Sequence, residues 1–226
     1  MNISIHISAG IIGMVLAIWL YIIPKGDARH RALGRWFLAC MALVVSTALI
    51  GVFFFVDRPF LTVVSLQSAY FSWFGLRAVQ LKGKPFTLWD GLALLLVLGI
   101  GLRFLSEINS EQVLWNATIV RYILVYLFLF VGFDLLRFFF PTLIQHPRLW
   151  LFDHIYKMTS AFGALVSAGM GTVLRNWEPY NQIVPAMATT AWLIFCLIYF
   201  TRRANASATN EKHSDKSIPS LPTETY

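Results

Sequence analysis

The chain has 226 residues, of which 58% are hydrophobic and only 13% charged, and its mean hydropathy is +0.66. A soluble domain carries about 25% charged residues and could not hide so much apolar surface from water, so composition excludes a soluble enzyme, a nucleic-acid-binding domain and a disulfide scaffold. The net charge of +7 comes mostly from basic residues beside apolar runs, a pattern typical of the cytoplasmic side of membrane proteins.

Seven apolar segments meet or approach the length of about 20 residues that a helix needs to cross the hydrocarbon layer. In chain order they are residues 3–23, 36–56, 60–76, 88–105, 121–140, 149–173 and 183–200. We therefore predict an all-α, polytopic membrane protein in which residues 1–200 form one domain of seven transmembrane helices. Its main partner is the lipid bilayer, and no nucleic acid is expected.

The basic residues predict the orientation of the chain. No lysine or arginine precedes the first segment, and a basic cluster from Lys25 to Arg35 follows it. Most of the 18 lysines and arginines lie in alternate loops and after the last segment, which predicts an outer N-terminus and an inner C-terminus. Residues 201–226 are rich in Ser, Thr, Asn and charge, and this composition predicts a disordered cytoplasmic tail.

Small residues indicate close contacts between helices. They repeat every four residues on two neighbouring faces of the sixth segment: Ser160, Ala164 and Ala168, and Gly163, Ser167 and Gly171. Such spacing lets helix backbones approach closely, so we predict a central position for this helix. Ser65, Ser68 and Ser72 share one face of the third segment, where they either join helices or line a permeation path.

Ionisable side chains inside the apolar segments cost at least about 2.5 kcal/mol each at the bilayer centre, so each one needs an explanation. Most of them lie at one depth, in the inner half of the bundle. The candidate ligand or proton site there comprises His30, Asp134, Asp153, His154 and Lys157. His6, near the outer end of the first segment, is an outer-side candidate.

Imidazole and carboxylate groups together suit a proton relay, a transition metal or the polar head of a quinone. In this interpretation His154 binds the proton or ligand, Asp153 is its electrostatic partner and Asp134 is a second carboxylate. A structural alternative stays open, because Asp134 with Arg137 (i, i+3) and Asp153 with Lys157 (i, i+4) could each neutralise one another within one helix.

A cofactor also stays open. A b-type haem needs two axial imidazoles at matching depth on facing elements, and His30 and His154 match in depth. His30, however, is expected in a loop, and His6 lies at the other side. If a transition metal binds, His30 and His154 are its ligands. The function is thus binding or transport of a small ligand, proton or metal, with a haem- or quinone-linked redox protein and a structural subunit of a membrane complex as alternatives.

Several short motifs occur in a fixed order along the chain. They are His6-Ile-Ser-Ala-Gly10, Lys25-Gly26, His30-Arg-Ala-Leu-Gly34-Arg35, Tyr70-Phe-Ser-Trp-Phe-Gly75, Gly132-Phe-Asp134 and Trp150-Leu-Phe-Asp-His154 with Met158. In order and spacing, residues 6 to 195 resemble a bacterial family of small multi-pass inner-membrane proteins of unknown function. The resemblance implies a bacterial inner-membrane protein with about seven helices, and it implies no substrate or catalytic residue.

Overall fold

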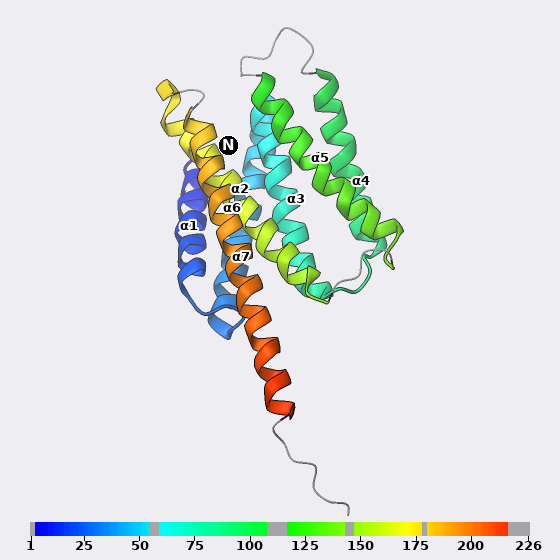
Figure 1. Ribbon diagram of the computed structural model, residues 1–226. Helices are drawn as coiled ribbons and strands as arrows, with labels where there is room; N and C mark the ends of the chain where they lie inside the picture. The colour runs from blue at the N-terminus through cyan, green and yellow to red at the C-terminus, as the bar shows by residue number, and fades with distance from the viewer. Residues whose placement is uncertain (1–2, 55–58, 108–116, 143–146, 178–179, 217–226) are drawn as a thin grey trace, which may run out of the picture.

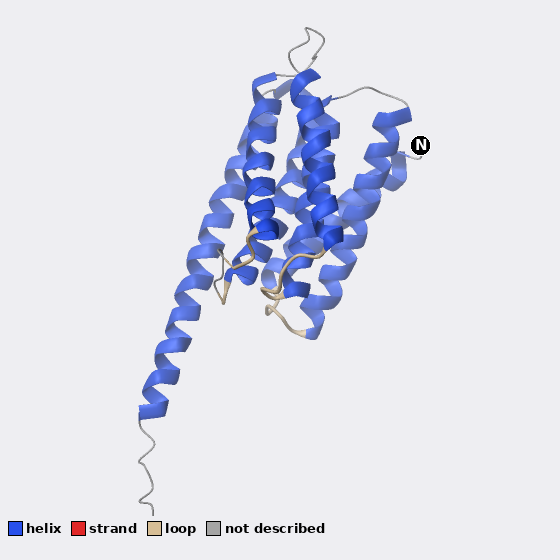
Figure 2. Cartoon of the chain, turned by 90° about the vertical axis from the view of Figure 1, so that its right-hand side faces the viewer, coloured by secondary structure: helices blue, strands red, loops and turns tan. Residues whose placement is uncertain are grey.

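The structure is a computed structural model that describes residues 3–54, 59–107, 117–142, 147–177 and 180–216. Within these ranges the chain forms helices and loops only, which confirms the all-α prediction (Figure 2). In chain order the elements are α1 (Ile3–Ile22), α2 (Ala28–Phe54), α3 (Pro59–Leu81), α4 (Leu88–Glu107), α5 (Ala117–Phe139), α6 (Leu149–Val173), the 3-10 turn η1 (Arg175–Trp177) and α7 (Tyr180–Lys216). The α-helices run up and down along a common axis, and α7 continues past the others (Figure 1).

Five of the described helices, α1, α2, α4, α5 and α7, are long and apolar enough to cross a membrane. The other two, α3 and α6, are less apolar and lie in the middle of the bundle (Figure 1). There α6 packs against α3, α7 and α1, which confirms its predicted central position, while α3 also contacts α2, α4 and α5. The five apolar helices carry exposed Leu, Ile and Trp side chains that suit contact with lipid.

Glycine allows the two central helices to approach each other. A Cβ atom on Gly75 of α3 would lie 2.2 Å from Met158 Cε and 3.1 Å from Lys157 Cβ of α6. Likewise, a Cβ atom on Gly163 of α6 would lie 2.8 Å from Thr189 Oγ1 of α7. The flexible end of Met158 can move away, but Lys157 Cβ and the Thr189 side chain would have to shift to admit a methyl group, so glycine allows the close approach of α6 to both neighbours.

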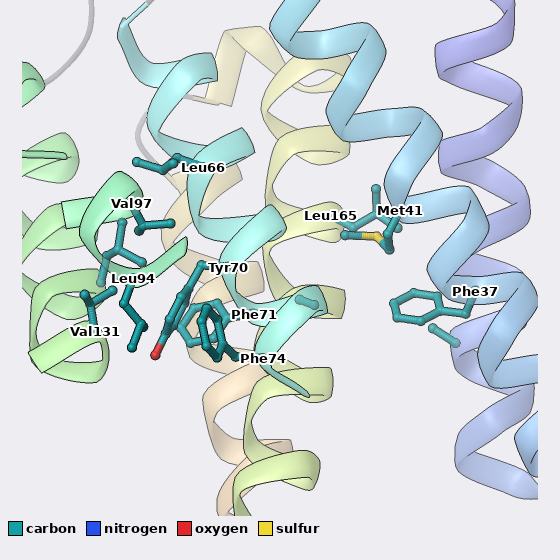
Figure 3. Close-up of a cluster of buried hydrophobic side chains, with 13 residues drawn as sticks. Phe37, Met41, Leu66, Tyr70, Phe71, Phe74, Leu94, Val97, Val131 and Leu165 are labelled. Carbon is teal, nitrogen blue, oxygen red and sulfur yellow. The ribbon is translucent and has the colours of Figure 1, made fainter. Parts of the chain in front are cut away.

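The main apolar core surrounds α3. Its aromatic residues Tyr70, Phe71 and Phe74 are at most 1% exposed. Figure 3 shows these three rings on α3, between side chains of α4 and α5 on one side and of α2 on the other. The surrounding side chains include Phe37, Met41, Leu94, Val97, Val131 and Leu165. The core thus packs α3 against four other helices, α2, α4, α5 and α6.

Two helices, α2 and α7, extend furthest beyond their predicted ends. α2 begins at Ala28 and not at residue 36, because the Asp27 side chain accepts a hydrogen bond from the backbone N–H of His30 at 2.6 Å and caps the helix. α7 continues through Lys216, which differs from the predicted disordered tail over the first part of residues 201–226. Extending an existing helix is far easier than starting one, so a polar sequence can continue it. Residues 217–226 lie outside the described residues.

Candidate functional site

Four charged side chains from α5 and α6 form an ion-pair cluster, which consists of Asp134 and Arg137 of α5 with Asp153 and Lys157 of α6. Lys157 Nζ lies 2.6 Å from Asp134 Oδ2 and 2.8 Å from Asp153 Oδ1. Arg137 Nη1 lies 2.8 Å from Asp153 Oδ2. The side chains of Asp134 and Lys157 are 0% and 1% exposed. Because two negative and two positive charges balance, the cluster can remain ionised away from water.

The charges are paired mainly between helices and not within them. Asp134 lies 2.6 Å from Lys157 of α6, but its contact with Arg137 in its own helix is 3.4 Å long. Arg137 in turn makes its shorter contact to Asp153 of α6. Both within-helix pairs predicted from the sequence are also present, Asp153–Lys157 at 2.8 Å and the longer Asp134–Arg137 contact at 3.4 Å. The cluster joins α5 to α6.

Tyr70 of α3 brings a third helix to the cluster. Its hydroxyl donates a hydrogen bond of 2.8 Å to Asp134 Oδ2. The Lys157 ammonium lies 5.8 Å from the Tyr70 ring centroid and 5.5 Å from that of Phe74, where the ring faces stabilise a cation. Sequence reasoning missed Tyr70, because nothing in the sequence distinguishes its hydroxyl from those of other aromatic residues in apolar segments.

Side chains alone connect α5 to α6. Among the described residues, no Cα atom of α5 lies within 8 Å of a Cα atom of α6. Besides the ion-pair cluster, the connection includes a hydroxyl chain made of Tyr126, Tyr156 and Ser160. Tyr156 donates a hydrogen bond to the Tyr126 hydroxyl, which lies 3.2 Å from Ser160 Oγ. The backbone of α5 packs instead against α3 and α4.

The two histidines of the predicted inner site lie outside the ion-pair cluster. His154 Nδ1 lies 2.8 Å from the carbonyl oxygen of Gly75, and because a carbonyl can only accept, Nδ1 carries the proton. His30 was expected in a loop, but this prediction is wrong: it lies in the first turn of α2, which Asp27 caps. The Nδ1 atom of His30 is buried and has no hydrogen-bond partner in the described part of the chain.

The described residues form no metal site with three or more protein ligands. No three His, Cys, Asp or Glu side chains in these residues lie close enough together to hold a metal ion. Asp134 and Asp153 already bind cationic side chains. A haem or metal on His30 and His154 stays a prediction.

The outer-side candidate His6 makes a contact between helices. Its Nδ1 lies 2.8 Å from Thr47 Oγ1 of α2. The Thr47 hydroxyl donates to the carbonyl oxygen of Leu43 at 2.6 Å, so it accepts from His6. This bond joins α1 to α2.

The serine face of α3 points into the bundle. Ser65, Ser68 and Ser72 are 8%, 5% and 9% exposed. Such burial between helices suits the joining role that the sequence left open. A permeation path along this face stays a prediction.

A further ion pair, missed from the sequence, closes the turn between α3 and α4. Asp90, 1% exposed, accepts hydrogen bonds from Arg77 Nε at 2.6 Å and Nη2 at 2.7 Å and from the Thr87 backbone N–H at 2.8 Å. The T-x-x-D spacing of Thr87 and Asp90 is a helix-start signal that could have revealed it. The ring centroid of Phe86 in this turn lies 4.9 Å from Arg137 Cζ, so the turn also contacts the ion-pair cluster.

Lys25 caps the C-terminal end of α1, at the same end of the bundle as the turn between α3 and α4. Its ammonium donates to the carbonyl oxygens of Leu20, Tyr21 and Ile23 at 2.6, 2.8 and 3.0 Å. A cation at this position satisfies the last carbonyls of the helix. Partial burial lowers the pKa of Lys25 from its usual value.

Comparisons with known proteins identify no family for this chain. No protein-family model, no curated protein and no solved structure matches the chain. The resemblance to a bacterial membrane family therefore stays a prediction, and the function has to be argued from the geometry of the ion-pair cluster.

Proposed function

We propose that the chain spans a bacterial inner membrane seven times, with its N-terminus outside and its C-terminus inside. The five apolar helices and the alternating directions in Figure 1 support this topology, with α3 and α6 crossing at the centre. Basic residues in the α1–α2 and α3–α4 connections and after the apolar part of α7 support the orientation. In this arrangement the ion-pair cluster lies in the inner half of the bundle.

We infer that the protein transports protons, with Asp134 as the group that takes up and releases the proton. The observation that carries this proposal is the fully buried Asp134 carboxylate, held by Lys157 and Tyr70 from two other helices. A buried ion pair adds little stability compared with apolar packing of the same volume. An ionised pair inside a spanning bundle is therefore better explained by a function than by stability.

Protonation of Asp134 changes how α5 is held against α6. The added proton removes one of the two negative charges and leaves Lys157 and Arg137 with one carboxylate, that of Asp153. Because side chains alone join α5 to α6, this loss weakens the contact between the α4–α5 hairpin and the rest of the bundle. A proton that binds one arrangement better than the other shifts the equilibrium between them, so protonation of Asp134 itself can gate proton transport.

Proton flux into vesicles tests the proposal. The purified protein is reconstituted with a trapped pH-sensitive dye, and flux is driven by a potassium diffusion potential. Asp134→Asn removes the proton-binding group while keeping its size, so we expect the flux to fall by about 100-fold.

Asp90→Asn is the matched control, because it removes the charge of another buried carboxylate, one that pairs with Arg77 and with no member of the ion-pair cluster. We expect its flux to equal that of the unmodified protein. Equal flux in the unmodified protein and Asp134→Asn would overturn the proposal. So would a flux no greater than that of protein-free vesicles.

A further inference from the structure

The hydroxyl chain continues the ion-pair cluster along the same two helices. Tyr126 precedes Asp134 by two turns of α5, about 12 Å, and Ser160 follows Lys157 by about one turn of α6. Aromatic rings surround the hydroxyl chain. Phe130 stacks on Tyr156 with 4.3 Å between the ring centroids. Phe71 contacts Tyr126 and Tyr156 edge-on, with centroid distances of 5.7 and 6.0 Å.

We propose that this hydroxyl chain is a proton relay that leads from the ion-pair cluster toward the outer half of the bundle. The proposal rests on the proposed function and assigns a route to the transported proton. In each step a hydroxyl oxygen takes a proton on a lone pair and passes its own proton to the next oxygen. One proton therefore crosses from Tyr156 through Tyr126 to Ser160, and no net change is left on the hydroxyls.

The relay begins beside the cluster. Tyr156 directly precedes Lys157 in α6 and lies three residues, about one helical turn, after Asp153, so these two side chains are neighbours on the helix surface. The first hydroxyl of the relay therefore lies next to a carboxylate of the cluster.

The relay ends at an apolar barrier. Beyond Ser160 and Tyr126, α3, α5 and α6 meet in a second apolar cluster, whose buried members are at most 8% exposed: Val63, Val64, Val120, Leu124 and Ala164. Ala164 lies one helical turn after Ser160. No proton can pass these side chains while they pack together, so the relay conducts only when this second apolar cluster opens. A closed barrier prevents a resting leak of protons.

Removing single hydroxyl groups tests the relay. Tyr156→Phe and Tyr126→Phe keep the rings and remove the hydroxyls, and we expect each to reduce proton flux by about 100-fold. Protonation of Asp134, measured by the infrared carboxyl band that Asp134→Asn removes, should keep its pH midpoint. A purely structural tyrosine pair would leave the flux unchanged.

Tyr21→Phe is the matched control. Tyr21 also donates to a hydroxyl of α6, Thr159 Oγ1 at 3.1 Å, but it does so from α1, on the far side of α6 from the relay. We expect flux equal to that of the unmodified protein. If Tyr156→Phe does not fold, Ser160→Ala takes its place, because it removes the last hydroxyl without disturbing a ring.

The outcomes separate this inference from the proposed function. Normal flux in Tyr156→Phe or Ser160→Ala, together with lost flux in Asp134→Asn, overturns the relay alone. Normal flux in Asp134→Asn overturns the proposed function and the relay with it. Leu124→Ala opens the barrier and should raise the resting leak of protons, so an unchanged leak contradicts the position of the barrier.

Discussion

The Lys157 ammonium is almost completely buried, yet two carboxylates lie within 2.8 Å of it. Each partner makes the burial of the other tolerable, because an unpaired charge in the bundle interior would be far more costly than a paired one. At the residue scale the cluster therefore behaves as a unit. Changing one member therefore alters how much the other three contribute to the stability of the fold.

We predict that Lys157→Met destabilises the protein by about 3–5 kcal/mol, because it leaves the buried Asp134 and Asp153 with only Arg137 as a cation. Thermal unfolding in detergent measures the effect. Lys157→Met combined with Asp134→Asn restores charge balance, so the double variant should lose less stability than the sum of the two single losses. Additive losses would contradict coupling within the cluster.

At the scale of helices, α3 and α6 meet at Gly75, where an added Cβ atom would lie 3.1 Å from Lys157 Cβ, tighter than ordinary van der Waals contact. Gly75 stands opposite Lys157 and Met158, and its carbonyl oxygen accepts the His154 bond. The same contact therefore sets the spacing of the central helices and the position of the first turns of α6. The geometry of the cluster depends on it.

We predict that Gly75→Ala lowers stability by about 1–3 kcal/mol, because the added methyl group pushes α3 away from α6. The measurement is again thermal unfolding in detergent. Gly99→Ala is the matched control: no atom lies within 4 Å of its new methyl group, and alanine favours a helix more than glycine does. A Gly75→Ala variant as stable as Gly99→Ala would show that the contact is not tight.

The apolar segments predicted where helices lie, because every backbone polar group in lipid must be bonded within a helix. They did not predict the first turns of α2, since a polar cap at Asp27 and not an apolar residue begins that helix. The depth of the charged residues could be predicted from their place in each segment. Their ion-pair partners could not be predicted from the sequence. The Arg137–Asp153 pair, for example, depends on how α5 and α6 are placed next to each other in the fold.

At the scale of the whole molecule, the orientation can be measured by labelling single cysteines. Cys40 and Cys196 are buried and are first replaced by alanine. We predict that Lys84→Cys, in the exposed α3–α4 turn, reacts only from the cytoplasmic side, and that Ser106→Cys, at the opposite end of α4, reacts only from outside. The reverse result would place the ion-pair cluster in the outer half.

The low apolarity of α3 and α6 has a consequence for how the protein is made. α3 leaves the ribosome long before α6, the helix that later packs against its Gly75. A solitary polar-faced segment partitions poorly into lipid. If α3 and α6 both cross the membrane, as proposed, α3 has to wait in the insertion channel, or against α2, until the sixth helix emerges.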